Sequence, residues 1–236
     1  LAREGARVAV VDVDASSAEQ VVRRVERVAR RRGPDAIFAA CDVSQPTQVK
    51  SAIEKTVEAF GRLDIVFANA GINGVWAPIE EIQPDEWDRT QAINLKGTYL
   101  CIHYAVPHLR RAGGGSVIVC SSVNGTRTFS TPGASAYSTS KAGQVALAKM
   151  AALELARHRI RVNAVCPGAI ETAIDQSTHP RNVEKLGIEV ELPAGHPALN
   201  EGVGAAEDVA DVVLFLASDL SRHVSGVEVF VDGGAS

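Results

Sequence analysis

The sequence predicts an α/β protein built around a doubly wound parallel sheet. Short runs of apolar, β-branched residues alternate with amphipathic helical segments along the chain. These runs are too apolar to leave one face in water, which is typical of parallel strands covered on both faces by crossover helices. With 236 residues and 46% hydrophobic side chains, the chain can bury one sizeable core, so we expect residues 1–236 to form a single domain.

The first βα unit illustrates the pattern. Residues 7–13, with the sequence RVAVVDV, form an apolar strand that runs into a helix. Either Ser16 or Ser17 is expected to cap this helix, because Glu19 or Gln20 stands three residues later in the pattern of a capping box.

Glycine, proline and the hydrophobic period define the remaining elements. The predicted strands are 36–43, 63–71, 116–122, 160–168 and 227–234. The predicted helices are 45–61, about 85–111, 136–158 and 205–218. Residues 173–204 show no regular period and are predicted to form a substrate lid within the domain, because long irregular stretches in compact domains usually carry function.

Charge and cysteine content narrow the class of protein. The net charge of −4 and the lack of an apolar run of membrane-spanning length argue against nucleic-acid and membrane partners. The dense basic run at residues 23–32 fits the solvated end of a helix. Four cysteines without a CxxC pair favour a reducing environment, so we expect a cytoplasmic protein.

Several polar or aromatic residues near the predicted lid carry weaker signals. The histidine and basic residues of the lid lack the spacing of a metal site, so no metal is expected there. We interpret these side chains as ordinary surface residues: His179, Arg181, Lys185 and His196. Trp76 and Ile79 could line an apolar wall for a substrate, although a place in the core or an interface fits Trp76 equally well.

The carboxyl ends of the predicted strands hold the first candidate binding residues, since ligands of such sheets bind there. Asp12 ends the first strand, where a carboxylate could accept hydrogen bonds from ribose hydroxyls and repel the extra phosphate of NADP. The next two strands end in the turns Asp42-Val43 and Asn69-Ala70-Gly71, which could contact adenine and let the backbone approach a cofactor. Each is also an ordinary turn former.

The stretch YSTSK, residues 137–141, is the sharpest chemical signal. Tyr137 and Lys141 are four residues apart on one helical face, so the ammonium can lie near the phenol. At ~4 Å and an effective dielectric constant of ~20, this charge stabilises a phenolate by about 4 kcal/mol, which predicts a tyrosine pKa lowered towards ~7. The alternative is a surface ion-dipole pair. The preceding strand ends in Ser121 and Ser122, and either could add a hydroxyl.

Six motifs in order give the chain a specific resemblance. They are NAG (69–71), NLKG (94–97), SS (121–122), YSTSK (137–141), RVNAVCPG (161–168) and VDGG (231–234). Over its whole length the chain resembles the short-chain dehydrogenase/reductase family, in the subgroup with the shorter chains. This resemblance implies a Rossmann-like fold that binds a nicotinamide cofactor, NAD or NADP.

The resemblance also implies a catalytic tetrad of Asn94, Ser122, Tyr137 and Lys141. Ser122 would bond the substrate oxygen, and Tyr137 would exchange the proton. Lys141 would lower the tyrosine pKa and hold the nicotinamide ribose. Asn94 would fix the long helix and a relay water, although an asparagine bonded to backbone inside a helix is the plainer interpretation. The nicotinamide side would be contacted by Pro167, Gly168, Ile170 and Thr172.

Two departures from the family pattern stand out. The loop between Ser122 and Tyr137 is longer than usual, so the catalytic serine could instead be Ser121. The glycine-rich turn of the type TGxxxGxG has no counterpart before Asp12, and residues 1–6 resemble the end of the helix that follows it. We therefore expect a further strand beside residues 7–13 and this turn to precede residue 1, and weak cofactor binding without them.

Three functions are compatible with this pattern. The first is an NAD-dependent dehydrogenase or reductase of a small alcohol or ketone, favoured by Asp12. The second is an NADPH-dependent 3-oxoacyl reductase, which Asp12 disfavours because its carboxylate would face the 2′-phosphate. The third is a cofactor-free structural or regulatory protein of the same fold. By resemblance, a homotetramer or homodimer would assemble through the two long helices and the last strand.

Overall fold

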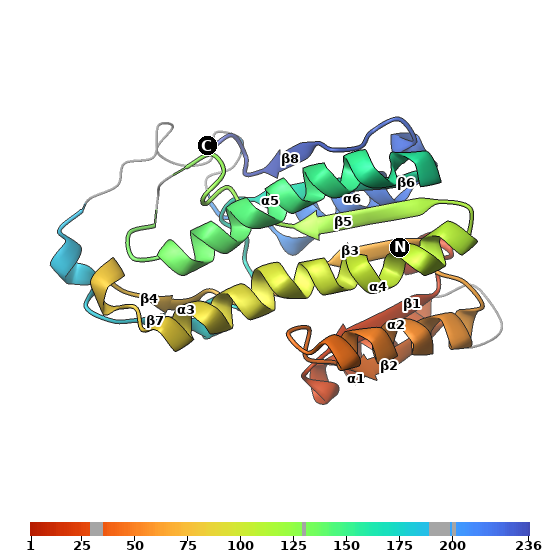
Figure 1. Cartoon of the computed structure of the whole chain (residues 1–236), viewed down its shortest axis with the longest axis horizontal. Helices are drawn as coiled ribbons and strands as arrows, with labels where there is room; N and C mark the ends of the chain where they lie inside the picture. Colours follow the sequence, from red (N-terminus) through yellow and green to blue (C-terminus); the bar gives the residue numbers. More distant parts are fainter. Residues whose placement is uncertain (29–34, 129–130, 189–198, 200–201) are drawn as a thin grey trace.

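The computed structural model describes residues 1–28, 35–128, 131–188, 199 and 202–236 (Figure 1). Its strands are β1 (Val8–Asp12), β2 (Ala36–Ala40), β3 (Ile65–Ala68), β4 (Gly74–Trp76), β5 (Gly115–Cys120), β6 (Ile160–Pro167), β7 (Thr178–Pro180) and β8 (Glu228–Val231). Its α-helices are α1 (Ala15–Val28), α2 (Pro46–Phe60), α3 (Pro84–Gln91), α4 (Gly97–Arg111), α5 (Ser135–Leu155) and α6 (Ala206–Ala217).

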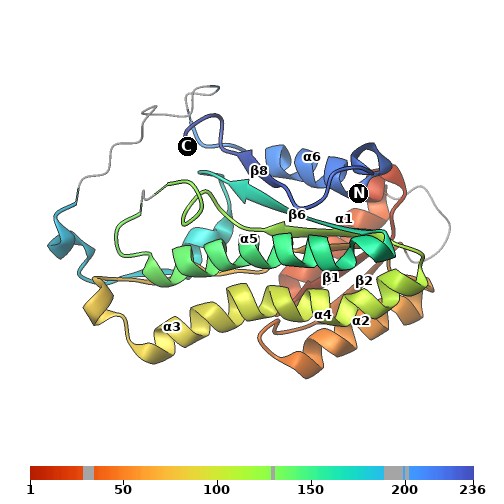
Figure 2. The same ribbon diagram turned by 45° about the horizontal axis from the view of Figure 1, so that its top comes forward.

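All strand pairs in the main sheet are parallel, which confirms the predicted α/β fold. The order is β3-β5-β6-β8, with β1-β2 as a separate pair. Helices α4 and α5 cover one face of the four strands and α6 covers the other (Figure 1 and Figure 2). Both faces of β5 are therefore buried. Val117 and Val119 pack under α4 and α5, whereas Ile118 packs under α6.

A cleft of about 570 Å³ separates the β1-β2 pair from the four-stranded sheet. Both β1 and β3 line it with their whole length, and they are not hydrogen-bonded to each other. The carboxyl-end rim of the cleft holds Asp12, Asn69 and Ala70, so it leads to the predicted cofactor residues.

The helix starts differ from the sequence prediction in two places. The cap of α1 is Asp14 rather than a serine: its carboxylate accepts hydrogen bonds from the amides of Ser16 at 2.9 Å and Ser17 at 3.2 Å. The Ser17 hydroxyl, which also donates to this carboxylate, and the two amides lower the pKa of Asp14, and the helix begins before either serine could cap it. The predicted helix 85–111 is α3 and α4 joined by a π-helical turn, Ala92–Lys96.

The predicted lid is partly structured. Within residues 173–188, strand β7 pairs in parallel with β4, and both strands are too short to have shown a period in the sequence. Residues 189–198 and 200–201, including His196, lie outside the described residues. None of the described helices is both long and apolar enough to cross a membrane.

Candidate active site

The end of β5 and the start of α5 bring the predicted serine and tyrosine together. Tyr137 lies in the first turn of α5, where the hydroxyl of Ser122 is close enough to its phenol to act on the pKa of Tyr137 and lower it. The hydroxyl of Ser121 points elsewhere, because it donates to the carbonyl of Lys141 at 2.8 Å. The geometry thus favours Ser122 over Ser121 as the serine that can reach a substrate oxygen.

Lys141 lies one turn further along α5 and is almost fully buried. Its Nζ donates to the carbonyl of Cys120 at 2.8 Å and lies 5.5 Å from the centre of the Tyr137 ring. Burial lowers the pKa of Lys141. A Cβ built on Gly71 would lie 3.5 Å from this Nζ, so the lysine reaches the turn after β3. The ammonium therefore lies between the tyrosine and the predicted cofactor residues.

The prediction of a lowered tyrosine pKa was wrong for this structure. Burial raises the pKa of Tyr137 to about 12, and the hydrogen bond with Ser122 only partly opposes this. The prediction assumed an ammonium ~4 Å from the phenol at an effective dielectric constant of ~20, with no cost for burying the phenolate. Instead, Lys141 is bonded to Cys120, and the phenol is 8% exposed. The tyrosine is a neutral phenol here, which is the form that donates a proton.

Asn94 joins three parts of the site. It lies in the π-helical turn with no exposed surface, and its side chain pairs with both backbone groups of Ile72, accepting from N–H and donating to C=O at 2.9 Å each. The amide also donates to Ser140 Oγ at 3.0 Å. The backbone carbonyl of Asn94 accepts from the side chains of Gln144 at 2.9 Å and Thr98 at 2.8 Å. Asn94 therefore does bond to backbone groups, as the plainer interpretation expects. Its role in fixing a relay water stays a prediction.

The predicted adenosine-side residues divide into two groups. Four of them line the cleft between β1 and β3: Asp12, Val43, Asn69 and Ala70. Asp42 is not among the lining residues, since its carboxylate accepts from the amide of Ser44 at 2.9 Å and closes the turn before α2. Gly71 packs against the active-site side chains, where a Cβ would come within 3.3 Å of Asn94 Oδ1.

The predicted nicotinamide-side residues follow β6. The carbonyl of Pro167 accepts from the amide of Val123 at 3.0 Å, which ties this segment to the turn after Ser122. Gly168 is held to the last strand by its amide, which donates to Val231 at 3.0 Å. Ile170 is bridged to Gly204, and Thr172 caps the 3₁₀ turn Ala173–Ser177 that opens the predicted lid. All four therefore lie on one segment leading from the site to the lid.

Sequence reasoning missed Ser140 and Gln144. Their positions, three and seven residues after Tyr137, place them on the same face of α5, which was a usable signal. Trp76 belongs to β4 and is half-buried, and its indole N–H is buried without a partner among the described residues. Ile79 is 71% exposed, so it does not form an enclosed wall. Within the described ranges no cluster of three or more potential metal ligands occurs.

Comparison with known sequences extends over the whole chain. A family model described as Enoyl-(Acyl carrier protein) reductase matches residues 1–236. The chain is 34% identical over 237 residues to the short chain dehydrogenase/reductase astE of Aspergillus oryzae, in a match that covers 100% of this chain and 87% of that protein.

Two solved structures are similar over nearly the whole fold. A 3-ketoacyl-ACP reductase from Sinorhizobium meliloti 1021 is 48% identical with a TM-score of 0.91, covering 99% of this chain and 91% of that one. A 3-ketoacyl-(acyl-carrier-protein) reductase from Brucella melitensis, complexed with NADH, is 30% identical with a TM-score of 0.84, covering 100% and 90%. Because the matches extend over the whole chain, they do not support the prediction of a further strand and glycine-rich turn ahead of residue 1.

Proposed function

Because the chain belongs to the short-chain dehydrogenase/reductase family, whose members transfer hydride between a nicotinamide cofactor and an alcohol or ketone, we propose that this enzyme uses NAD and that Tyr137 is its acid/base. The observation that carries the proposal is the gathering of Ser122, Tyr137 and the buried Lys141, whose Nζ lies 5.5 Å from the centre of the Tyr137 ring. A structural or regulatory protein has no need of a buried lysine held without a carboxylate among its hydrogen-bond partners.

The residues of the site fit a dinucleotide. The rim of the cleft offers the exposed Asp12 carboxylate and the Asn69-Ala70 turn. Because Gly71 has no side chain, a ligand can approach the backbone there, next to Lys141. Asp12 would hold the adenosine ribose, and Lys141 the ribose next to the nicotinamide. When bound, the cofactor supplies or accepts the hydride.

The chain's own residues perform the proton chemistry. In the reducing direction, the Ser122 hydroxyl donates to the substrate carbonyl, and the neutral Tyr137 gives its proton to that oxygen as the carbon is reduced. For Lys141 to stabilise the phenolate that results, its ammonium must turn from the Cys120 carbonyl towards the phenol, whose ring centre lies 5.5 Å from Nζ. Asn94 is a positioning residue, because all polar groups of its side chain are engaged with Ile72 and Ser140. The reverse sequence oxidises an alcohol.

The cofactor preference is tested by titrating NADH and NADPH separately and following fluorescence. We expect NADH to bind more tightly by about tenfold or more, which is about 1.4 kcal/mol, because the Asp12 carboxylate repels the 2′-phosphate. Asp12→Ala should reduce this ratio towards one, whereas Glu19→Ala, on the exposed face of α1, should leave it unchanged. Tighter binding of NADPH by the unaltered chain would contradict the NAD assignment.

A 3-oxoacyl thioester is the second candidate substrate class. It is favoured by the 48% identity to the 3-ketoacyl-ACP reductase of Sinorhizobium meliloti and by the description of the matching family model. The chemistry at Ser122 and Tyr137 is the same for a 3-oxoacyl group and for a simple ketone. The two classes differ in what the segment after Thr172 must accommodate.

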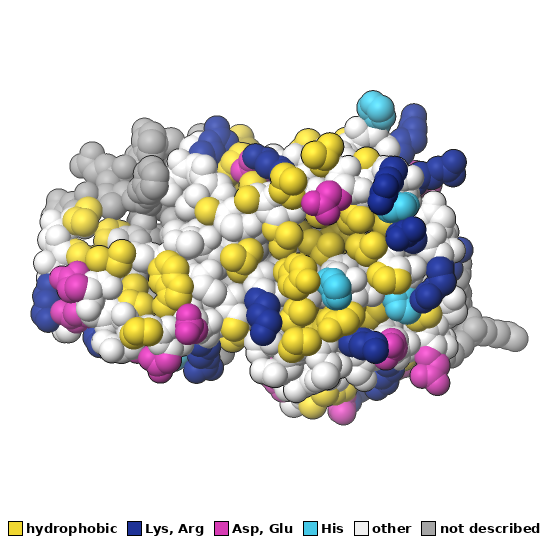
Figure 3. Space-filling model, viewed as in Figure 1, with side chains coloured by type: hydrophobic (Ala, Val, Ile, Leu, Met, Phe, Trp, Pro, Cys, Tyr) yellow, Lys and Arg dark blue, Asp and Glu magenta, His cyan; other side chains and the backbone are white. Residues whose placement is uncertain are grey.

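We further propose a homotetramer or homodimer assembled through α4 and α5. Figure 3 shows apolar side chains gathered on the face that these helices form, and Tyr99, Met150 and Leu153 are 47–73% exposed there. Apolar patches of this kind mark protein interfaces. Sedimentation should give a mass of two or four chains, and the double variant Met150→Lys, Leu153→Lys should shift it towards one. A monomeric mass for the unaltered chain would contradict this proposal.

A further inference from the structure

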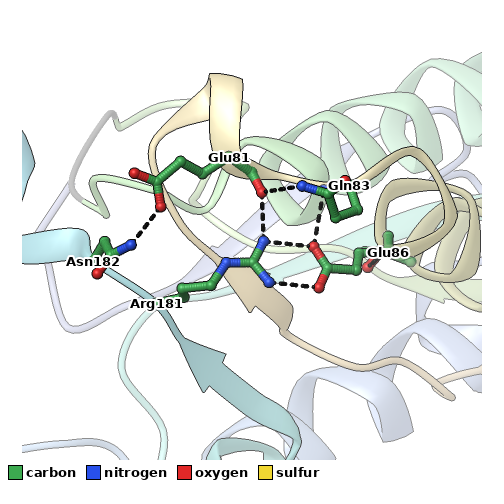
Figure 4. A network of polar contacts seen from close by, with 6 residues as sticks. Glu81, Gln83, Glu86, Arg181 and Asn182 are labelled. Atoms are coloured by element: carbon green, nitrogen blue, oxygen red, sulfur yellow. Dashed lines mark hydrogen bonds and ion pairs between the residues drawn. The ribbon is translucent and has the colours of Figure 1, made fainter.

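The described part of the predicted lid is fastened to α3 by one arginine. Figure 4 shows the Arg181 guanidinium gripping both oxygens of Glu86, at 2.7 and 2.8 Å, while it also donates to the carbonyl of Glu81. The neighbouring Asn182 and Lys185 both bond the Glu81 carboxylate, the lysine at 2.9 Å. We call this set, Glu81, Glu86, Arg181, Asn182 and Lys185, the lid clamp.

The lid clamp is more than an isolated surface ion pair. Its central pair is two-pronged, and the side chains are 37% exposed for Arg181 and 22% for Glu86. Glu86 also accepts from the amide of Gln83 at 2.9 Å, so its position is fixed by the start of α3. Arg181 lowers the pKa of Glu86 to about 2, and the pair therefore stays charged across the neutral range.

A continuous path of contacts joins the lid clamp to the candidate active site. The amide of Arg181 donates to Trp76 at 2.8 Å and ends the β4-β7 pairing. At the other end of this pairing, Asn73 binds the hydroxyls of Ser177 at 2.9 Å and Thr178 at 2.8 Å. The next residue back, Ile72, is the backbone partner of Asn94.

We propose that Arg181 is a positioning residue for the reaction, holding residues 173–182 against β4 and α3 so that the substrate side of the site keeps its shape. This inference rests on the proposed function. Arg181 does not touch the reacting groups, so its loss should weaken capture of the substrate and leave the proton transfer at Tyr137 intact. The cofactor cleft lies along β1 and β3 and should be unaffected.

The test compares Arg181→Gln and Glu86→Gln with the unaltered enzyme, using a ketone that the latter reduces. Each variant should raise KM for the ketone about tenfold or more, with kcat within about threefold and the Kd of NADH unchanged. Arg181→Lys keeps the positive charge but cannot bind both oxygens of Glu86 in the same way. Its KM for the ketone should therefore lie between the values of Arg181→Gln and the unaltered enzyme. The control is Arg23→Gln, which removes an arginine–glutamate ion pair, with Glu19, on the exposed face of α1 and outside the cleft.

Hydrogen exchange gives a second measurement that does not depend on turnover. The amide of Arg181 is bonded to Trp76, so Arg181→Gln should speed exchange over residues 178–182 by about tenfold or more and leave α5 unchanged. An unchanged KM would overturn the positioning role, whether or not exchange increases. An unaltered enzyme that reduces no ketone would instead refute the proposed function, and this inference with it.

Discussion

Replacing Tyr137 with Phe is expected to lower kcat by roughly 10²- to 10⁴-fold, the usual contribution of a positioned acid/base. The phenol is the proton donor of the proposed mechanism, and its raised pKa keeps it in the neutral form that donates. Phenylalanine keeps the ring and its packing but removes this proton. The Kd of NADH should change little, since the predicted adenosine contacts lie along the cleft at Asp12.

The matched control for this variant is Tyr99→Phe. Tyr99 is 47% exposed on α4, so the same loss of a hydroxyl there should leave kcat unchanged. Stopped-flow measurement of NADH oxidation would give kcat, and fluorescence titration would give the Kd. Turnover retained by Tyr137→Phe would remove Tyr137 from the mechanism.

Gly125→Ala is expected to cost about 2 to 5 kcal/mol in the free energy of unfolding, combining a left-handed backbone with overpacking. Gly125 has φ of +80°, and a Cβ there would lie 2.2 Å from the carbonyl oxygen of Ser138. That carbonyl belongs to the first turn of α5, directly after Tyr137. Relief of the clash must therefore move either the loop or the catalytic turn, so kcat should fall as well.

Gly61→Ala separates the two causes. Gly61 has nearly the same φ, +81°, but a Cβ there meets nothing within 4 Å. The Gly61→Ala variant should lose only the roughly 1 to 2 kcal/mol of unfolding free energy that a left-handed alanine costs, and it should keep its activity. Urea unfolding of both variants measures the difference. Equal losses of stability would contradict the steric argument at Gly125.

The main strands could be predicted because each carries a local signal. The apolar run 160–168 became β6, Ile160–Pro167, since both of its faces are buried and a turn follows at Gly168. The site residues at the strand ends followed from the same logic. Tyr137 and Lys141 do share one helical face, as their spacing predicts.

The features that the sequence did not predict depend on contacts between residues far apart in the chain. The carbonyl of Cys120 holds Lys141, and no spacing in YSTSK reveals that partner. Arg181 was interpreted as a surface residue, but it pairs with Glu86, 95 residues away in the sequence. The strands β4 and β7 are three residues each, too short for a period, and their pairing became visible only in three dimensions.

The most direct test of hydride transfer with Tyr137 as the acid is to supply NADH with deuterium at both C4 positions, together with each of a panel of simple ketones and acetoacetyl-CoA, and to locate the label in the product. For any compound of this panel that is reduced, the account predicts an alcohol product with deuterium on the carbinol carbon and the new hydroxyl proton from solvent, at a rate that Tyr137→Phe reduces by roughly 10²-fold or more. If a panel of simple ketones and acetoacetyl-CoA acquires no deuterium from the unaltered chain, or if Tyr137→Phe transfers it equally fast, the account is wrong.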